Sequence, residues 1–201
     1  MILLSFSKEG AVEAGCDEAG RGCIAGPVFA AAVILPSDFH HEILNDSKKI
    51  SRKHREILRP VIEKEAISWG VAKINPREID RINILNASFK AMHKALDLLN
   101  ERPNHLLIDG NRFHEYQDIS HECIIKGDGK YNSIAAASIL AKTYRDDFME
   151  SFHNRYPYYD WVNNKGYPTV KHRQGVIDNG PCIHHRTSFR LYPAWEQGKL
   201  F

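Results

Sequence analysis

Apolar residues along this chain gather into short runs that suit β-strands, separated by stretches that suit helices. Strands are predicted at residues 12–16, 28–35, 67–74, 106–109 and 123–128. The run 28–35 consists almost entirely of Val, Ala, Ile and Leu, which is typical of a strand covered on both faces. Because only a short step around Gly26 and Pro27 separates the first two runs, we expect an antiparallel hairpin at the front of the sheet.

Helical patterns fill the stretches between and after these strands. Helices are predicted at residues 51–66, 75–100, 132–153 and 169–178. Ser51 is a suitable N-cap for the first helix, and Pro60 predicts a kink or an interruption within it. A core-facing stripe runs along the second helix and consists of Leu85, Phe89, Met92, Leu96 and Leu99. Alternating strands and helices predict an α/β domain with a mixed sheet flanked by helices, and a loop-rich helical part follows Pro157.

The composition fits one globular domain. The chain has 201 residues, of which 43% are apolar and 26% charged, and no repeat or composition shift divides it. The apolar residues 1–6 are too short for a signal sequence, and no run is long enough to cross a bilayer. The four cysteines are scattered and form no Cys-x-x-Cys pair, so we expect them to be reduced. We therefore expect one domain over residues 1–201, in the cytoplasm and away from membranes.

Basic residues are clustered although the formal net charge is only +2. The first cluster comprises Lys48, Lys49, Arg52, Lys53 and Arg55, and the second comprises Lys165, Lys171, Arg173, Arg186 and Arg190. Clustered bases on a nearly neutral chain suit a face that binds a polyanion. Charge alone does not distinguish such a face from two solvated surfaces.

Carboxylates stand at the ends of three predicted strands: Asp17 with Glu18, Asp109 and Asp128. Strand ends of an α/β sheet gather at one edge, where ligands bind. Two like charges about 4 Å apart repel by about 4 kcal/mol at an effective dielectric of 20, so four gathered carboxylates require protons or cations. Oxygen ligands without Cys or His select Mg²⁺ or Mn²⁺. Two such ions would balance the four charges and form the pair that phosphodiester hydrolysis uses.

The adjacency of Asp17 and Glu18 leaves one question of geometry open. In a regular strand their side chains would point to opposite faces of the sheet. Both serve one site only if the chain leaves strand geometry there, and otherwise one of them contributes through its backbone carbonyl.

The segment from Gly20 to Ala25 fits a relaxed dinucleotide-binding pattern, G-x-G-x-x-A. A strand follows it instead of a helix, so no helix N-terminus is available for a pyrophosphate and this interpretation is rejected. Glycines on both sides of Arg21 suit a loop whose backbone amides approach a phosphate or a sugar closely. A simple tight turn would not require the arginine.

These motifs occur together in an order that resembles bacterial ribonuclease HII, of the type 2 ribonuclease H family. The matching blocks are residues 17–22, 26–28, 46–49, 108–111, 126–128, 134–142 and 165–167, then His172, His185, Arg186, Ser188 and Phe189. Together they span about residues 11–190. A sister type, ribonuclease HIII, has a different residue between the two glycines and an additional N-terminal domain, so Arg21 and the short N-terminus favour type HII.

The resemblance implies a ribonuclease H-like fold and a role for each matching position. Asp17, Glu18, Asp109 and Asp128 correspond to the family's catalytic and metal-binding acids, whose two ions would be Mg²⁺ or Mn²⁺. Gly20, Arg21 and Gly22 correspond to the loop that contacts the ribonucleotide 2′-hydroxyl and its neighbouring phosphates. Tyr167 resembles the tyrosine that stacks on the sugar after the ribonucleotide and thereby senses an RNA-to-DNA junction. The C-terminal part, from about residue 160 to 201, would belong to the substrate-binding surface.

The implied activity is that of a monomeric endonuclease that cuts on the 5′ side of a ribonucleotide. Its substrates would be RNA–DNA hybrids and duplex DNA with single embedded ribonucleotides, and its products would carry 3′-hydroxyl and 5′-phosphate ends. The alternatives are another two-metal DNA nuclease of similar sheet architecture and a catalytically silent nucleic-acid-binding module. The silent module would require a missing acid, and all four are present.

Further residues in the matching blocks have weaker assignments. Four cations expected to bind phosphates are Lys48, Lys49, Lys142 and Arg186, although each alone could be a surface charge. Asn111 and Ser138 either contact the nucleic-acid backbone or only cap a turn and pack a helix. His172 is either a phosphate contact or a surface residue of the last short helix.

Overall fold

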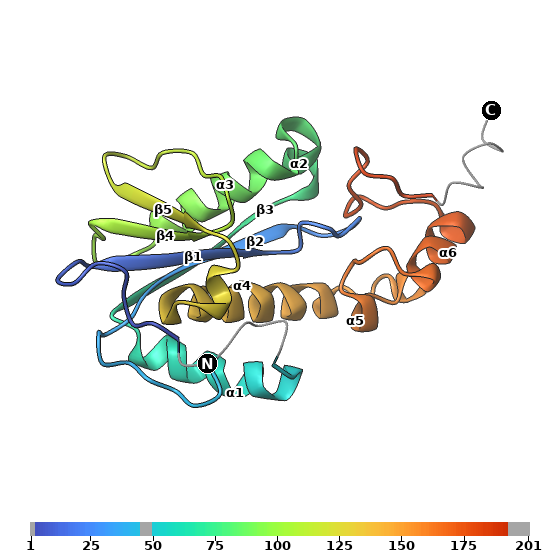
Figure 1. The fold of residues 1–201 in the computed structure, drawn as a ribbon. Helices are drawn as coiled ribbons and strands as arrows, with labels where there is room; N and C mark the ends of the chain where they lie inside the picture. Colours follow the sequence, from blue (N-terminus) through green and yellow to red (C-terminus); the bar gives the residue numbers. More distant parts are fainter. Residues whose placement is uncertain (1–2, 45–49, 193–201) are drawn as a thin grey trace.

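The computed structural model describes residues 3–44 and 50–192 and contains a five-stranded mixed sheet (Figure 1). The strands are β1 (Glu13–Ala19), β2 (Val28–Ile34), β3 (Ser68–Ile74), β4 (His105–Asp109) and β5 (Ser120–Ile124), and their order across the sheet is β3-β2-β1-β4-β5. Strand β2 is antiparallel to both β1 and β3, whereas β4 and β5 run parallel to β1. The predicted α/β class with a mixed sheet and an initial hairpin is confirmed.

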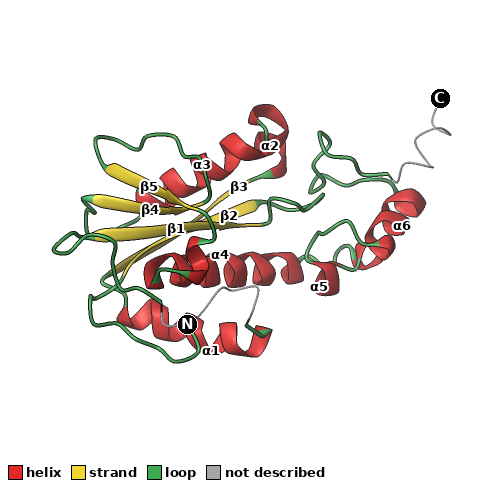
Figure 2. Cartoon of the chain, viewed as in Figure 1, coloured by secondary structure: helices red, strands yellow, loops and turns green. Residues whose placement is uncertain are grey.

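Helices cover both faces of this sheet and continue beyond its edge. They are α1 (Arg52–Glu65), α2 (Pro76–Ile82), α3 (Ile84–Leu96), α4 (Asn132–Ser151), α5 (Trp161–Asn164) and α6 (Val170–Asn179), with short 3-10 turns η1 (Gly127–Gly129) and η2 (Pro157–Tyr159). Figure 2 shows α2 and α3 on one face and α4 on the other, with α1 packed against the outer side of α4. The loops and short helices after α4 lie beyond the C-terminal end of that helix, as the sequence predicted. No helix within residues 3–44 and 50–192 is long and apolar enough to span a membrane.

The hydrophobic core lies on both faces of the sheet. Strand β2 is buried along its whole length, as its apolar composition predicted. Ala30 and Ala32 face α3, whereas Ala31 and Val33 face α4. Small residues let α4 approach β1 closely: a Cβ atom on Gly15 would lie 2.3 Å from the carbonyl carbon of Ser133. A third apolar cluster, built around Trp161 and Met149, joins the C-terminal segment to the end of α4.

Three predicted elements differ from the structure. Helix α1 runs unbroken through Pro60, so the interruption expected there is wrong. The helical region predicted over residues 75–100 is divided into two helices. Asn83 adopts a positive φ of 64°, and its side chain accepts a hydrogen bond from the Asn86 amide, which caps α3. Strand β5 ends at Ile124, since Lys126 takes the left-handed conformation and turns the chain into η1.

Candidate active site

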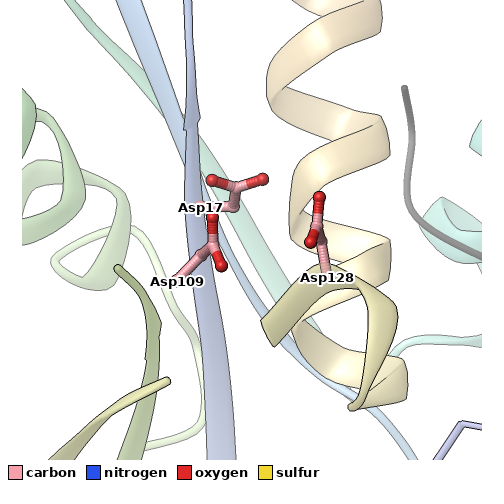
Figure 3. A group of neighbouring side chains, drawn as sticks. All are labelled: Asp17, Asp109 and Asp128. Carbon is pink, nitrogen blue, oxygen red and sulfur yellow. The ribbon is translucent and has the colours of Figure 1, made fainter. Parts of the chain in front are cut away.

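Three aspartates from separate elements converge at one edge of the sheet (Figure 3). Asp17 lies near the end of β1 and Asp109 is the last residue of β4, and these strands are parallel neighbours in which Cys16 pairs with Ile108. Alternation along both strands directs the two aspartates to the face that α4 covers. Asp128 comes from η1, directly before α4, and one carboxylate oxygen of each aspartate lies within 4.8 Å of the others.

Asp128 therefore reaches the site by a different route from the one that the sequence predicted. It is not at the end of a strand, because β5 stops four residues earlier and the chain turns back towards the sheet. The Gly127 amide donates a hydrogen bond of 2.7 Å to Asp109 Oδ1, which ties this turn to β4. A Cβ atom on Gly127 would lie 2.6 Å from Ile134 Cδ1, so a larger residue at 127 would require the Ile134 side chain or the turn to shift.

The electrostatics of this cluster favour a cation. The pKa of the Asp17 carboxyl is raised well above its ordinary value, first by burial and then by the negative charges of Glu18 and Asp109. The Ser138 hydroxyl and the Glu18 amide, which is 2.7 Å from Asp17 Oδ1, donate hydrogen bonds that oppose this shift and orient the carboxylate. A site formed by three carboxylates, without Cys or His, offers hard oxygen ligands that fit a divalent ion.

Glu18 lies next to this cluster but outside the group of three. Strand β1 continues to Ala19, so the chain keeps strand geometry and the Glu18 side chain points to the face opposite Asp17. Its Oε1 atom is 3.0 Å from Arg21 Nη1. The role of Glu18 as a metal ligand remains a prediction, and the strand geometry favours a contribution from its backbone carbonyl.

A hollow of about 200 Å³ opens at the end of β1, next to Glu18. It is lined by Glu18, Ala19, Gly20, Arg21, Gly22, Ser138, Lys142, Arg145 and Tyr167. Tyr167 is 44% exposed, and a Cβ atom on Gly22 would lie 3.8 Å from its ring. The structure thus brings together the glycine loop and the tyrosine, which are about 145 positions apart in the chain. Ser138 connects this hollow to the aspartates, because it lines the hollow and also binds Asp17.

The remaining predicted contacts fall into different environments. Lys142 lines the hollow, and its ammonium group binds both carboxylate oxygens of Asp146, the nearer at 2.5 Å. Asn111 is exposed two residues after Asp109. Lys48 and Lys49 lie outside the described residues.

The surface positions expected for His172 and Arg186 are wrong, because both side chains are completely buried. His172 Nδ1 is 2.8 Å from the Tyr167 carbonyl oxygen, and its Nε2 accepts a hydrogen bond of 3.0 Å from Trp161. Arg186 donates to the carbonyl oxygens of Gly26 and Arg21 at 2.9 and 3.0 Å. Neither residue is on the surface where a phosphate would contact it directly. Each instead supports the backbone of a segment that lines the hollow.

Arg145 is a residue of this region that the sequence did not identify. Its side chain is 1% exposed and lies on α4, where it donates hydrogen bonds to three backbone carbonyls. The available sequence signal was its position midway between Ala141 and Met149, at helical spacing on a face that is otherwise apolar. A charged residue in such a stripe indicates a buried polar contact.

The sheet order and the aspartate cluster define the class of protein, since both accord with ribonuclease H-like hydrolases. The fold is similar to a ribonuclease HII from Archaeoglobus fulgidus, solved in a complex with PCNA, with a TM-score of 0.74 and 25% identity over 90% of this chain and 96% of that one. It is also similar to ribonuclease H2 from Pyrococcus horikoshii, with a TM-score of 0.71 and 23% identity over 89% and 94% of the two chains.

Sequence comparison identifies the family within that class. The model of the family described as ribonuclease HII matches residues 14–192. A curated ribonuclease HII from Bacteroides thetaiotaomicron is 62% identical over 190 residues, which are 94% of this chain and 95% of that protein. The chain therefore belongs to the ribonuclease HII family, and it is a hydrolase with the endonuclease activity of a ribonuclease H.

Proposed function

We propose that this enzyme cuts the phosphodiester bond on the 5′ side of a ribonucleotide and leaves 3′-hydroxyl and 5′-phosphate ends. Its substrates would be RNA–DNA hybrids and duplex DNA that contains a single ribonucleotide. The observation that carries this proposal is the hollow lined by the glycine loop and Tyr167, which Ser138 links to Asp17. A general nuclease would need the aspartates but would not need a second surface for the sugar.

The glycine loop supports recognition of a ribose. Within duplex DNA, the 2′-hydroxyl is the one chemical mark of a ribonucleotide, so a selective enzyme must contact it closely. Gly20 and Gly22 carry no side chains, and this leaves the backbone amides of the loop accessible to a hydroxyl or a phosphate. The Arg21 side chain is 49% exposed and can approach a neighbouring phosphate, while Tyr167 offers a ring face to the next sugar.

The aspartates support metal-dependent hydrolysis. Asp17, Asp109 and Asp128 would hold two Mg²⁺ or Mn²⁺ ions, with Glu18 as a further ligand. When bound, such a pair activates water for in-line attack and stabilises the charge that develops on the leaving 3′-oxygen. The protein fixes the ligands in advance: Ser138 orients Asp17, and the Gly127 amide orients Asp109. That the enzyme works as a monomer in the cytoplasm remains a prediction.

The test compares two duplexes of identical sequence, one all-DNA and one with a single ribonucleotide, each with Mg²⁺, Mn²⁺ or chelator. We expect cutting of the ribonucleotide-containing duplex alone, and only with metal. Asp17→Asn should abolish cutting while binding stays measurable. Asp118→Asn, at an exposed position two residues before β5 begins, should leave cutting unchanged. Cutting of the all-DNA duplex, or turnover by Asp17→Asn, would contradict the proposal.

A further inference from the structure

Two buried arginines hold the backbone segments that line the hollow. Arg145 of α4 donates from Nε to the Pro27 carbonyl at 3.0 Å and from Nη2 to the Ala25 carbonyl at 3.1 Å. Its Nη1 donates to the Lys165 carbonyl at 2.7 Å. One guanidinium group therefore bridges the segment that follows the glycine loop and the segment that leads into Tyr167.

Arg186 binds the glycine loop and the residues that follow it. Its Nε donates to the Gly26 carbonyl at 2.9 Å, and its Nη1 donates to the Arg21 carbonyl at 3.0 Å, in the middle of the glycine loop. The Arg186 amide also donates to the Ile24 carbonyl. Together the two side chains bind five backbone carbonyls, of which four lie within residues 21–27 and one, that of Lys165, lies in the segment before Tyr167.

Direct contact also links the glycine loop to Arg145. A Cβ atom on Gly20 would lie 1.9 Å from Arg145 Nε, and Gly20 has a φ of +95°, so a side chain at position 20 would displace the guanidinium. Gly166 is packed similarly on the other segment, because its Cβ atom would lie 2.5 Å from the Ala25 carbonyl oxygen. The spacing between the loop and the tyrosine segment is therefore set by contacts that tolerate little displacement.

The stability of the fold does not by itself explain why two arginines are buried here. Neither arginine forms an ion pair with a carboxylate within the described parts of the chain, although both are buried. Burial and the neighbouring charge of Arg145 lower the pKa of Arg186 to about 10, so the Arg186 guanidinium stays charged at neutral pH. Buried charges that are not paired with opposite charges usually destabilise a fold relative to apolar residues of similar size. The planar guanidinium group of Arg145 has a fork of donors that can bind carbonyls on two segments at once, and an apolar side chain cannot replace it in this role.

We propose that Arg145 and Arg186 are positioning residues that fix the distance between the glycine loop and Tyr167, and thereby set the preference for a single embedded ribonucleotide. The inference rests on the proposed function, because it assumes that the loop contacts the ribose and that Tyr167 contacts the following deoxyribose. An isolated ribonucleotide can be recognised only if both contacts form together. A continuous hybrid offers a ribose at every position and depends less on this spacing.

The test measures kcat/KM for a duplex with one ribonucleotide and for a long RNA–DNA hybrid. Arg145→Lys keeps the charge, but a single ammonium group cannot span carbonyls on both segments. We expect it to lower kcat/KM for the single ribonucleotide about tenfold more than kcat/KM for the hybrid. Arg186→Lys should shift this ratio in the same direction, and it serves as the second variant if Arg145→Lys does not fold. Met92→Ala, buried on the opposite face of the sheet, is the control for lost stability, and urea unfolding of each variant measures that loss.

Equal losses on the two substrates in both lysine variants, as expected for Met92→Ala, would reduce the two arginines to a structural role and overturn the inference. A wild-type enzyme that cuts the hybrid but not the single ribonucleotide would instead overturn the proposed function. The two failures are distinguishable because the first appears only in the variants and the second already in the wild type.

Discussion

Replacing Asp109 with asparagine should stabilise the metal-free protein while it abolishes catalysis. Asparagine has nearly the same shape, and its Oδ1 can still accept the hydrogen bond that the Gly127 amide donates to Asp109 Oδ1 at 2.7 Å. The substitution therefore removes a negative charge and leaves the local structure intact. The effect on stability reports how strongly the aspartates repel one another.

The magnitude follows from the geometry of the cluster. Carboxylate oxygens within 4.8 Å of one another repel by at least about 3.5 kcal/mol per charged pair at an effective dielectric of 20. Asp109 is partly exposed, so solvent screens its charge and the net gain should be smaller. We expect about 1–2 kcal/mol, which corresponds to an increase in Tm of roughly 2–8 °C for a chain of this size.

Thermal denaturation at pH 8 provides the assay, first with chelator and then with excess Mn²⁺. Wild type should gain stability from the ion because binding relieves the repulsion. Asp109→Asn should begin at a higher Tm, gain much less from Mn²⁺ and show no cutting. Asp118→Asn should match wild type in all three respects. A variant less stable than wild type in chelator, or one that gains equally from Mn²⁺, would refute the idea that these carboxylates form a strained cation site.

Three further predictions concern other parts of the structure. Burial and the neighbouring His172 lower the pKa of His185 to about 4. As the pH falls below about 6.5, the unfolded chain therefore binds a proton at His185 that the folded chain does not. The free energy of unfolding should fall by about 2 kcal/mol between pH 7.5 and 5. Urea midpoints would measure this, and the loss should be smaller in His185→Gln; an unchanged loss would contradict the assignment. Tyr167→Ala should reduce cutting at a single ribonucleotide more than cutting of long hybrids, with a stability change within about 0.5 kcal/mol because the ring is half exposed. Equal losses in a paired cleavage assay would count against a junction contact. Ser138→Ala removes a hydrogen bond to Asp17 and should raise the Mn²⁺ concentration for half-maximal activity by roughly tenfold, whereas an unchanged metal titration would exclude an orienting role.

The sequence predicted the parts of the site that depend on local pattern. Apolar runs ending in acids placed Asp17 and Asp109 on strands, and parallel neighbouring strands bring such ends to one edge. The route of Asp128 was missed because a left-handed residue at Lys126 ends the strand early, and an apolar run does not reveal such a turn. The sequence position of this aspartate was informative, although its secondary structure was not.

Residues buried by contacts between distant segments were harder to interpret. His172 and Arg186 have polar side chains in a polar stretch, so sequence alone favoured the surface or a phosphate. Their burial depends on Trp161 and on the backbone of residues 21–26, which only the tertiary fold brings near. The role of Arg145 was not predictable for the same reason, since its three carbonyl partners lie 20 or about 120 positions away in the sequence.

The position and chemistry of the cut test the central claim most directly. A duplex with one ribonucleotide, labelled at the 5′ end of the strand that contains it, would be incubated with Mn²⁺ and its products resolved at single-nucleotide resolution. The proposed function predicts a labelled product that ends at the deoxynucleotide before the ribonucleotide and carries a 3′-hydroxyl that a polymerase can extend. A cut on the 3′ side that leaves a cyclic phosphate would contradict it. The nucleophile would then be the 2′-hydroxyl group, and a water molecule activated by metal ions at the aspartates would have no role.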